Sequence, residues 1–77
     1  MVKNMEQRLV ESVQFWLDTT NRPITVNERI IRVLKNKFVE MLDADIKANT
    51  EMLQQSCNDK RLQMIGFMQS LRDELKA

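Results

Sequence analysis

The feature that most constrains this sequence is its lack of chain-breaking residues, since proline occurs only as Pro23 and glycine only as Gly66. Folds built from strands and tight turns depend on these two residue types, so a strand-rich fold is disfavoured. The chain is also rich in Glu, Lys, Arg, Gln, Leu and Met, which favour helices. We therefore expect an all-α fold, with a single helical domain over residues 1–77.

The first helix is predicted over residues 2–20. Its apolar residues recur at intervals of three and four and form one stripe, with polar residues on the other faces. The members of the stripe are Val2, Met5, Leu9, Val13 and Trp16, with Val10 and Leu17 beside them. Thr19, Thr20 and Asn21 are weak helix formers. Arg22 precedes a proline, which disfavours helical geometry, so the helix should end before it.

The second helix is predicted to begin near Val26, after a tight turn at residues 21–25. Thr25 and Glu28 have the spacing of a capping box, in which each side chain accepts a hydrogen bond from the other residue's backbone N–H. Because the turn is short, the two helices should be antiparallel neighbours and form a helical hairpin.

Residues 26–76 carry one apolar seam that is compatible with a single continuous helix, about 75 Å long. The core residues predicted on this seam are Leu34, Phe38, Leu42, Ile46, Leu53, Met64, Met68, Leu71 and Leu75. Two breaks are also compatible with the pattern. Residues 48–50 could end one helix and cap the next, and Ser56 with Asp59 could form a second capping box near 56–59. A break in either place gives a three-helix bundle.

The two alternatives differ in what they leave exposed. A first helix of about 28 Å covers only half of a continuous second helix, so a partner chain would have to cover the apolar residues of 53–75. A three-helix bundle can cover its own core, so in that case a partner chain is possible but is not required. A chain of 77 residues is marginally stable in both cases, so we expect oligomerisation to complete the fold.

The charge changes sign along the second helix, because residues 22–37 are mostly basic and residues 40–51 mostly acidic. Two copies would complement each other when paired antiparallel, so the predicted partner is a second copy in an antiparallel homodimer, or another helical protein. The basic stretch also supports an alternative function, a nucleic-acid-binding regulator. Its phosphate contacts would be Arg29, Arg32, Lys35 and Lys37. Against this alternative, the basic residues spread over about 200° of the helix.

Six apolar side chains exceed what a single core face needs and are the predicted partner contacts. They are Phe15, Ile31, Val39, Leu62, Ile65 and Phe67. Leu62 and Ile65 flank Gly66, a position where another backbone could come close. The predicted function is therefore a non-catalytic protein–protein interaction or oligomerisation module, acting as a small adaptor, chaperone-like or regulatory subunit.

The sequence offers little for catalysis or metal binding. It contains no histidine, the commonest general base, and no glycine-rich loop to hold a phosphate. Cys57 is the only cysteine, cannot form an internal disulfide or a zinc site, and is interpreted as a buried thiol on the seam. We therefore expect no enzyme activity, no cofactor and no metal.

A lone thiol fits a reducing compartment and no apolar run approaches the ~20 residues of a membrane span, so we expect a cytoplasmic or nuclear protein.

Overall fold

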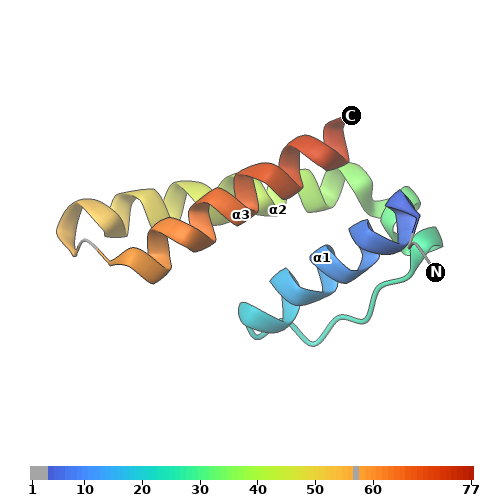
Figure 1. Cartoon of the computed structure of the whole chain (residues 1–77), viewed down its shortest axis with the longest axis horizontal. Coiled ribbons are helices and arrows are strands. Elements are labelled where there is room, and N and C mark those ends of the chain that lie inside the picture. The colour runs from blue at the N-terminus through green and yellow to red at the C-terminus, as the bar shows by residue number, and fades with distance from the viewer. Residues whose placement is uncertain (1–3, 57) are drawn as a thin grey trace. The chain divides into compact units, whose positions relative to one another are not determined.

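The computed structural model describes residues 4–56 and 58–77. These residues form three helices and no strand, so the expected all-α fold is confirmed for this part of the chain (Figure 1). The chain divides into two compact units, unit 1 (Met1–Lys35) and unit 2 (Asn36–Ala77), and the single domain over residues 1–77 stays a prediction. Cys57, which is predicted on the apolar seam, lies outside the described residues.

In unit 1, α1 spans Met5–Thr19, and the first two residues of the predicted helix 2–20, Val2 and Lys3, lie outside the described residues. Asn4 is the N-cap of α1. Its side chain accepts a hydrogen bond from the Gln7 backbone N–H at 2.8 Å, and the Gln7 side chain accepts one from the Asn4 N–H at 3.4 Å. This reciprocal pair is a capping box, with asparagine in place of serine or threonine.

One face of α1 is buried, as the apolar stripe predicts. Val13, Trp16 and Leu17 have no exposed surface, and Leu9 is half-buried. Phe15 lies about 100° around the helix from Trp16 and is exposed. From Leu9 onward the stripe identifies the face of α1 that packs, whereas Met5, also predicted on the stripe, is 84% exposed.

The end of α1 is a Schellman motif built on Asn21, which has a left-handed φ of 59°. The Asn21 N–H bonds the carbonyl of Asp18 at 3.1 Å, and the Arg22 N–H bonds that of Leu17 at 2.9 Å. The Arg22 guanidinium also lies 5.3 Å from the centroid of the Trp16 ring. The predicted end of the helix is confirmed, and these contacts are its physical cause.

Residues 20–27 join α1 to α2, which spans Glu28–Gln55. Asn27 caps α2, because its side chain accepts a hydrogen bond from the Ile30 N–H at 2.9 Å. The predicted cap at Thr25 and the predicted helix start near Val26 are therefore wrong. The connection is longer than the predicted turn because residues 22–27 stay outside any helix.

A kink interrupts α2 at Leu34, the residue inside it with non-helical dihedral angles (φ −103°, ψ 16°). The kink lies next to the boundary between the two units. The sequence predicts Leu34 in the core seam, but its side chain is 41% exposed. The buried part of the seam therefore starts one helical turn later, at Phe38.

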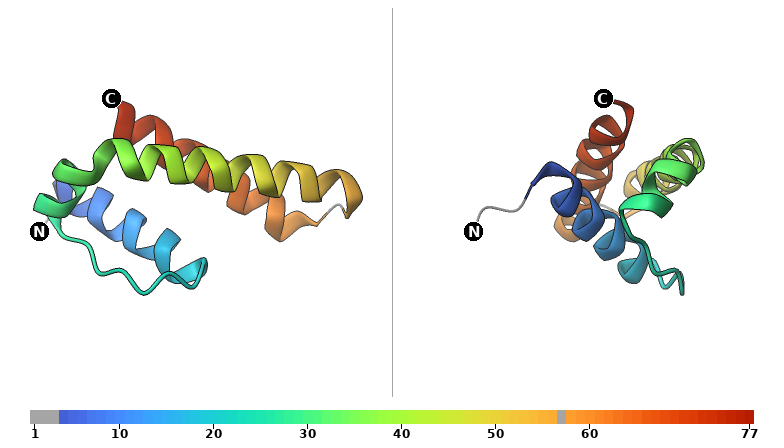
Figure 2. Two further views of the ribbon diagram at one scale, coloured as in Figure 1. Left: turned by 180° about the vertical axis from the view of Figure 1, so that it is seen from behind. Right: turned by 90° about the vertical axis from the view of Figure 1, so that its right-hand side faces the viewer.

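In unit 2, the rest of α2 packs side by side with α3 (Asp59–Lys76) as an antiparallel helical pair (Figures 1 and 2). The predicted interruption near residues 56–59 is confirmed, and the alternative of one continuous helix over 26–76 is wrong. Asn58 is the N-cap of α3, and its side chain accepts a backbone hydrogen bond at 2.9 Å. The predicted capping box starting at Ser56 is therefore wrong.

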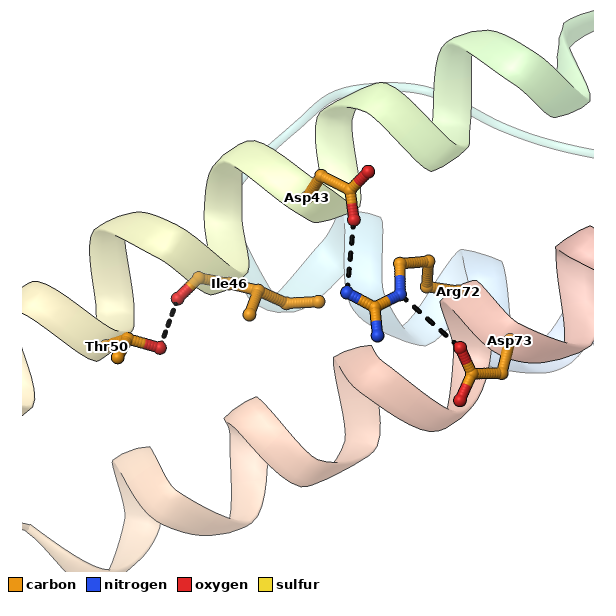
Figure 3. A network of polar contacts seen from close by, with 5 residues as sticks. All are labelled: Asp43, Ile46, Thr50, Arg72 and Asp73. Atoms are coloured by element: carbon orange, nitrogen blue, oxygen red, sulfur yellow. Dashed lines mark hydrogen bonds and ion pairs between the residues drawn. The ribbon is translucent and has the colours of Figure 1, made fainter.

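No break occurs at residues 48–50, the other predicted position. The Asn49 side chain donates to the Asp45 carbonyl at 2.8 Å. The Thr50 hydroxyl donates to the Ile46 carbonyl at 2.7 Å (Figure 3). Polar side chains that bond a carbonyl one turn earlier are satisfied within the helix. These residues therefore interrupt the apolar pattern without ending α2.

The core of unit 2 coincides with most of the predicted seam. The buried residues of the seam are Phe38, Leu42 and Ile46 on α2 and Met68, Leu71 and Leu75 on α3, and Ile65 on α3 is also buried. Leu53 and Met64 are half-buried. Burial of each large apolar side chain stabilises the fold by about 1.5–3 kcal/mol, so this seam is the main source of stability in unit 2.

Arg72 links the two helices of unit 2. Its guanidinium lies 3.2 Å from the Asp43 carboxylate on α2 and 3.4 Å from the neighbouring Asp73 (Figure 3). The hydrogen bond to Asp43 raises the pKa of Arg72 above its ordinary value. Because this contact joins residues 29 positions apart, it identifies the register in which α3 returns along α2.

Candidate partner-binding groove

An open groove of about 570 Å³ lies in unit 1, between α1 and the segment that leads into α2. Its apolar lining residues are Val10 and Val26. Its polar lining residues are Gln7, Glu11, Asn27, Glu28 and Arg29. All seven belong to unit 1, so the groove is a property of one compact unit.

Gln14 holds the connecting segment against α1. Its Nε2 donates to the Ile24 carbonyl at 2.9 Å and to the Asp18 carboxylate at 3.0 Å, and its Oε1 accepts from the Val26 N–H at 3.0 Å. The side-chain amide thereby satisfies backbone groups that have no helix or strand partner. As a result the segment runs back alongside α1 (Figure 1), and Val26 is placed in the groove.

The first turns of α2 are attached to α1 by an ion pair. The Arg32 Nη2 lies 2.9 Å from the Glu6 Oε1, and this hydrogen bond raises the pKa of Arg32 above its ordinary value. Both side chains are exposed to solvent, so the pair orients the helix more than it stabilises it. Gln14 therefore positions the connecting segment and Arg32 positions the first turns of α2, and both lie across the groove from α1.

The groove is lined by apolar residues and by charged residues of both signs, here named the rim charges. Glu11 and Glu28 are acidic, and Arg29 is basic. Glu28 also lies in the first turn of α2, where a carboxylate complements the positive end of the helix dipole. Surfaces that contact another protein commonly combine apolar residues with polar and charged residues, as this lining does.

Other kinds of site find no support among residues 4–56 and 58–77. No group of three or more acidic or cysteine side chains in these ranges is arranged to hold a metal ion. In the same residues, no helix combines the length and the apolar character that crossing a membrane requires.

The six predicted partner contacts do not line the groove. They range from exposed Phe15 (56%) and Leu62 (46%), through half-buried Val39 and Phe67, to buried Ile31 (6%) and Ile65 (8%). Packing within the chain therefore accounts for Ile31 and Ile65, and the reason for assigning them to a partner no longer holds. Phe15 follows Glu11 by one helical turn on α1, so it is the exposed aromatic that extends this surface.

The four residues of the nucleic-acid alternative have different surroundings. Arg29 lines the groove, and Arg32 is bonded to Glu6. Lys35 is half-buried in unit 1, and Lys37 is exposed in unit 2. This alternative stays a prediction, and none of these contacts favours it.

The sequence prediction missed the groove because it treated the polar face of α1 as a solvated surface. Gln7, Glu11 and Gln14 recur at steps of four and three, which places them in a second stripe beside the apolar one. That polar stripe is the signal that could have identified the groove. Its role still depends on the connecting segment, whose path the spacing does not specify.

Comparisons of this sequence with protein-family models, with curated proteins and with solved structures return no significant match. The geometry of the groove is therefore the basis for assigning a function.

Proposed function

We propose that this chain is a non-catalytic protein–protein interaction module, acting as a small adaptor or regulatory subunit, that binds a second copy of itself through the groove of unit 1. The observation that carries the proposal is the make-up of the groove. It places the apolar Val10 and Val26 beside two adjacent opposite charges, Glu28 and Arg29.

Two-fold symmetry explains why such a rim suits a second copy. In a symmetric dimer every contact occurs twice: if a first residue of one chain contacts a second residue of the other chain, the second residue of the one chain also contacts the first residue of the other. Glu28 would pair with the partner's Arg29, and Arg29 would pair with the partner's Glu28. A second copy therefore always supplies the charges that this rim requires.

The size of the groove predicts a weak dimer. Stable interfaces bury about 1,200–2,000 Å² in total, and Val26 is already largely buried within its own chain. Phe15 and Ile24 are two of the exposed apolar residues of unit 1, and their burial would enlarge the contact. We therefore expect a dissociation constant on the order of micromolar.

This dimer differs from antiparallel pairing along the second helices. The kink at Leu34 lies inside the basic block 22–37, so Arg22, Arg29 and Arg32 do not share one unbroken helix with the acidic residues 40–51. Asp43 is also already bonded to Arg72 within the chain. The groove therefore has more support as the surface for self-association than the charge blocks do.

Reversing the two rim charges, singly and together, tests the proposal. Arg29→Glu places like charges opposite each other twice in the dimer, and Glu28→Arg does the same. Each should weaken association on the order of tenfold. The double variant Glu28→Arg/Arg29→Glu restores both pairs and should recover most of the lost affinity. Sedimentation equilibrium over a micromolar range measures the dissociation constant.

The matched control is Lys47→Glu, a charge reversal at an exposed position of unit 2, which should leave the dissociation constant unchanged. Circular dichroism establishes that each variant keeps its helicity, because a base in the first turn of α2 opposes the helix dipole. A wild-type chain that stays monomeric at micromolar concentration would contradict the proposal. A double variant as weak as the single variants would contradict it too.

A further inference from the structure

The kink in α2 resides in one residue. Leu34 has φ −103° and ψ 16°, whereas helical residues have values near −63° and −42°. The helix continues on both sides of this residue, so Glu28–Gln55 is a single helix with one internal joint. Returning to a straight helix therefore requires a change mainly in the dihedral angles of a single residue.

The usual covalent causes of a kink are absent from the sequence around Leu34. Sharp kinks occur mostly at proline, at glycine or serine, or where an extra residue or water enters the helix. The chain's only proline and glycine are Pro23 and Gly66, and both lie outside α2. The residues flanking the joint, Val33 and Lys35, are compatible with a continuous helix. Local sequence therefore does not hold the bent form in place.

Packing does not hold the joint in place either. Val33 is 74% exposed and Leu34 is 41% exposed, although both are apolar. Leu34 precedes Phe38 and Leu42 at steps of four, but only those two are buried. The packing of unit 2 thus ends before the joint, and the boundary between the units follows directly after Lys35. Segments with few buried contacts are the ones that rearrange at low free-energy cost.

We propose that α2 is a jointed helix that exchanges between a bent and a straight form at Leu34. Along the chain, the joint lies in unit 1, one residue before its last residue, Lys35. A ligand that binds one form of α2 more tightly than the other would shift the equilibrium toward that form.

Distances between pairs of spin labels on α2 test this proposal. The joint-spanning pair is Arg29→Cys with Lys47→Cys, and the control pair is Asn36→Cys with Gln54→Cys, all at exposed positions. Cys57→Ser removes the single native thiol from both. Each pair is separated by the same five helical turns, about 27 Å in a straight helix. The labelled chain is mixed with an excess of unlabelled chain, so that distances between labels on two different copies do not contribute.

The control pair should give one narrow distribution near the straight-helix distance. The joint-spanning pair should give two populations, one at the control distance and one shorter. Leu34→Gly should enlarge the shorter population, because glycine favours the helix less than leucine does. A joint-spanning distribution that matches the control would overturn the proposal, and so would one short, narrow distribution that Leu34→Gly leaves unchanged.

Discussion

Asparagine determines where most of the helices begin or end. The side chains of Asn4, Asn27 and Asn58 each accept a hydrogen bond from a first-turn N–H, and Asn21 supplies the left-handed residue after α1. A short amide side chain suits both tasks, because it reaches nearby backbone groups and tolerates the left-handed conformation. The sequence prediction chose Thr25 and Ser56 instead. Candidates two residues apart are equally good caps, so the choice depends on contacts made by the preceding segment.

Gly66→Ala should stabilise the chain. Gly66 lies inside α3, its φ is not positive, and a Cβ added there meets no atom within 4 Å. Alanine in a helix interior is favoured over glycine by about 0.5–1 kcal/mol, so the free energy of unfolding should rise by about that amount. Urea denaturation at a fixed protein concentration measures it. No gain, or a loss, would indicate that another backbone approaches this position, as the sequence suggests.

The elements were predictable to different degrees. The buried face of α1 and the break near residues 56–59 follow from local spacing, which the sequence records directly. The kink at Leu34 does not, because neither proline nor glycine is present to mark it. The groove also escaped prediction, since Gln14 bonds backbone groups ten and twelve residues further along the chain. Contacts at that separation depend on the path of a connection that has no periodic pattern.

Gln14→Leu should release the connecting segment from α1. Leucine keeps the helix propensity and the approximate size, but it leaves the Val26 N–H and the Ile24 carbonyl without their partner. We expect the free energy of unfolding to fall by about 1–3 kcal/mol. The matched control is Gln69→Leu at an exposed position of α3, which should change stability by less than about 0.5 kcal/mol. Equal effects of the two substitutions in urea denaturation would argue against a structural role for Gln14.

The whole molecule has little stability to spare. A chain of 77 residues has a free energy of unfolding of about 4–11 kcal/mol, and here the described residues divide between two compact units. Leu42→Ala, in the core of unit 2, should by itself cost about 2–5 kcal/mol. A partner that binds only the folded chain would add stability by mass action. Self-association and core packing are therefore two separate sources of stability, and they respond differently to protein concentration.

That difference gives a prediction for thermal unfolding. If the wild-type chain dimerises with micromolar affinity, raising its concentration about 100-fold through the dissociation constant should raise the unfolding midpoint by roughly 5–10 °C. Arg29→Glu should reduce this dependence over the same concentration range, because it weakens association on the order of tenfold and leaves the cores intact. Leu42→Ala should lower the midpoint at every concentration but keep the slope, because unit 1 and its groove retain their residues. Thermal unfolding followed by circular dichroism across the concentration range measures the unfolding midpoint of all three chains. A wild-type midpoint that does not move with concentration would mean that the packing within units 1 and 2 supplies all of the chain's stability.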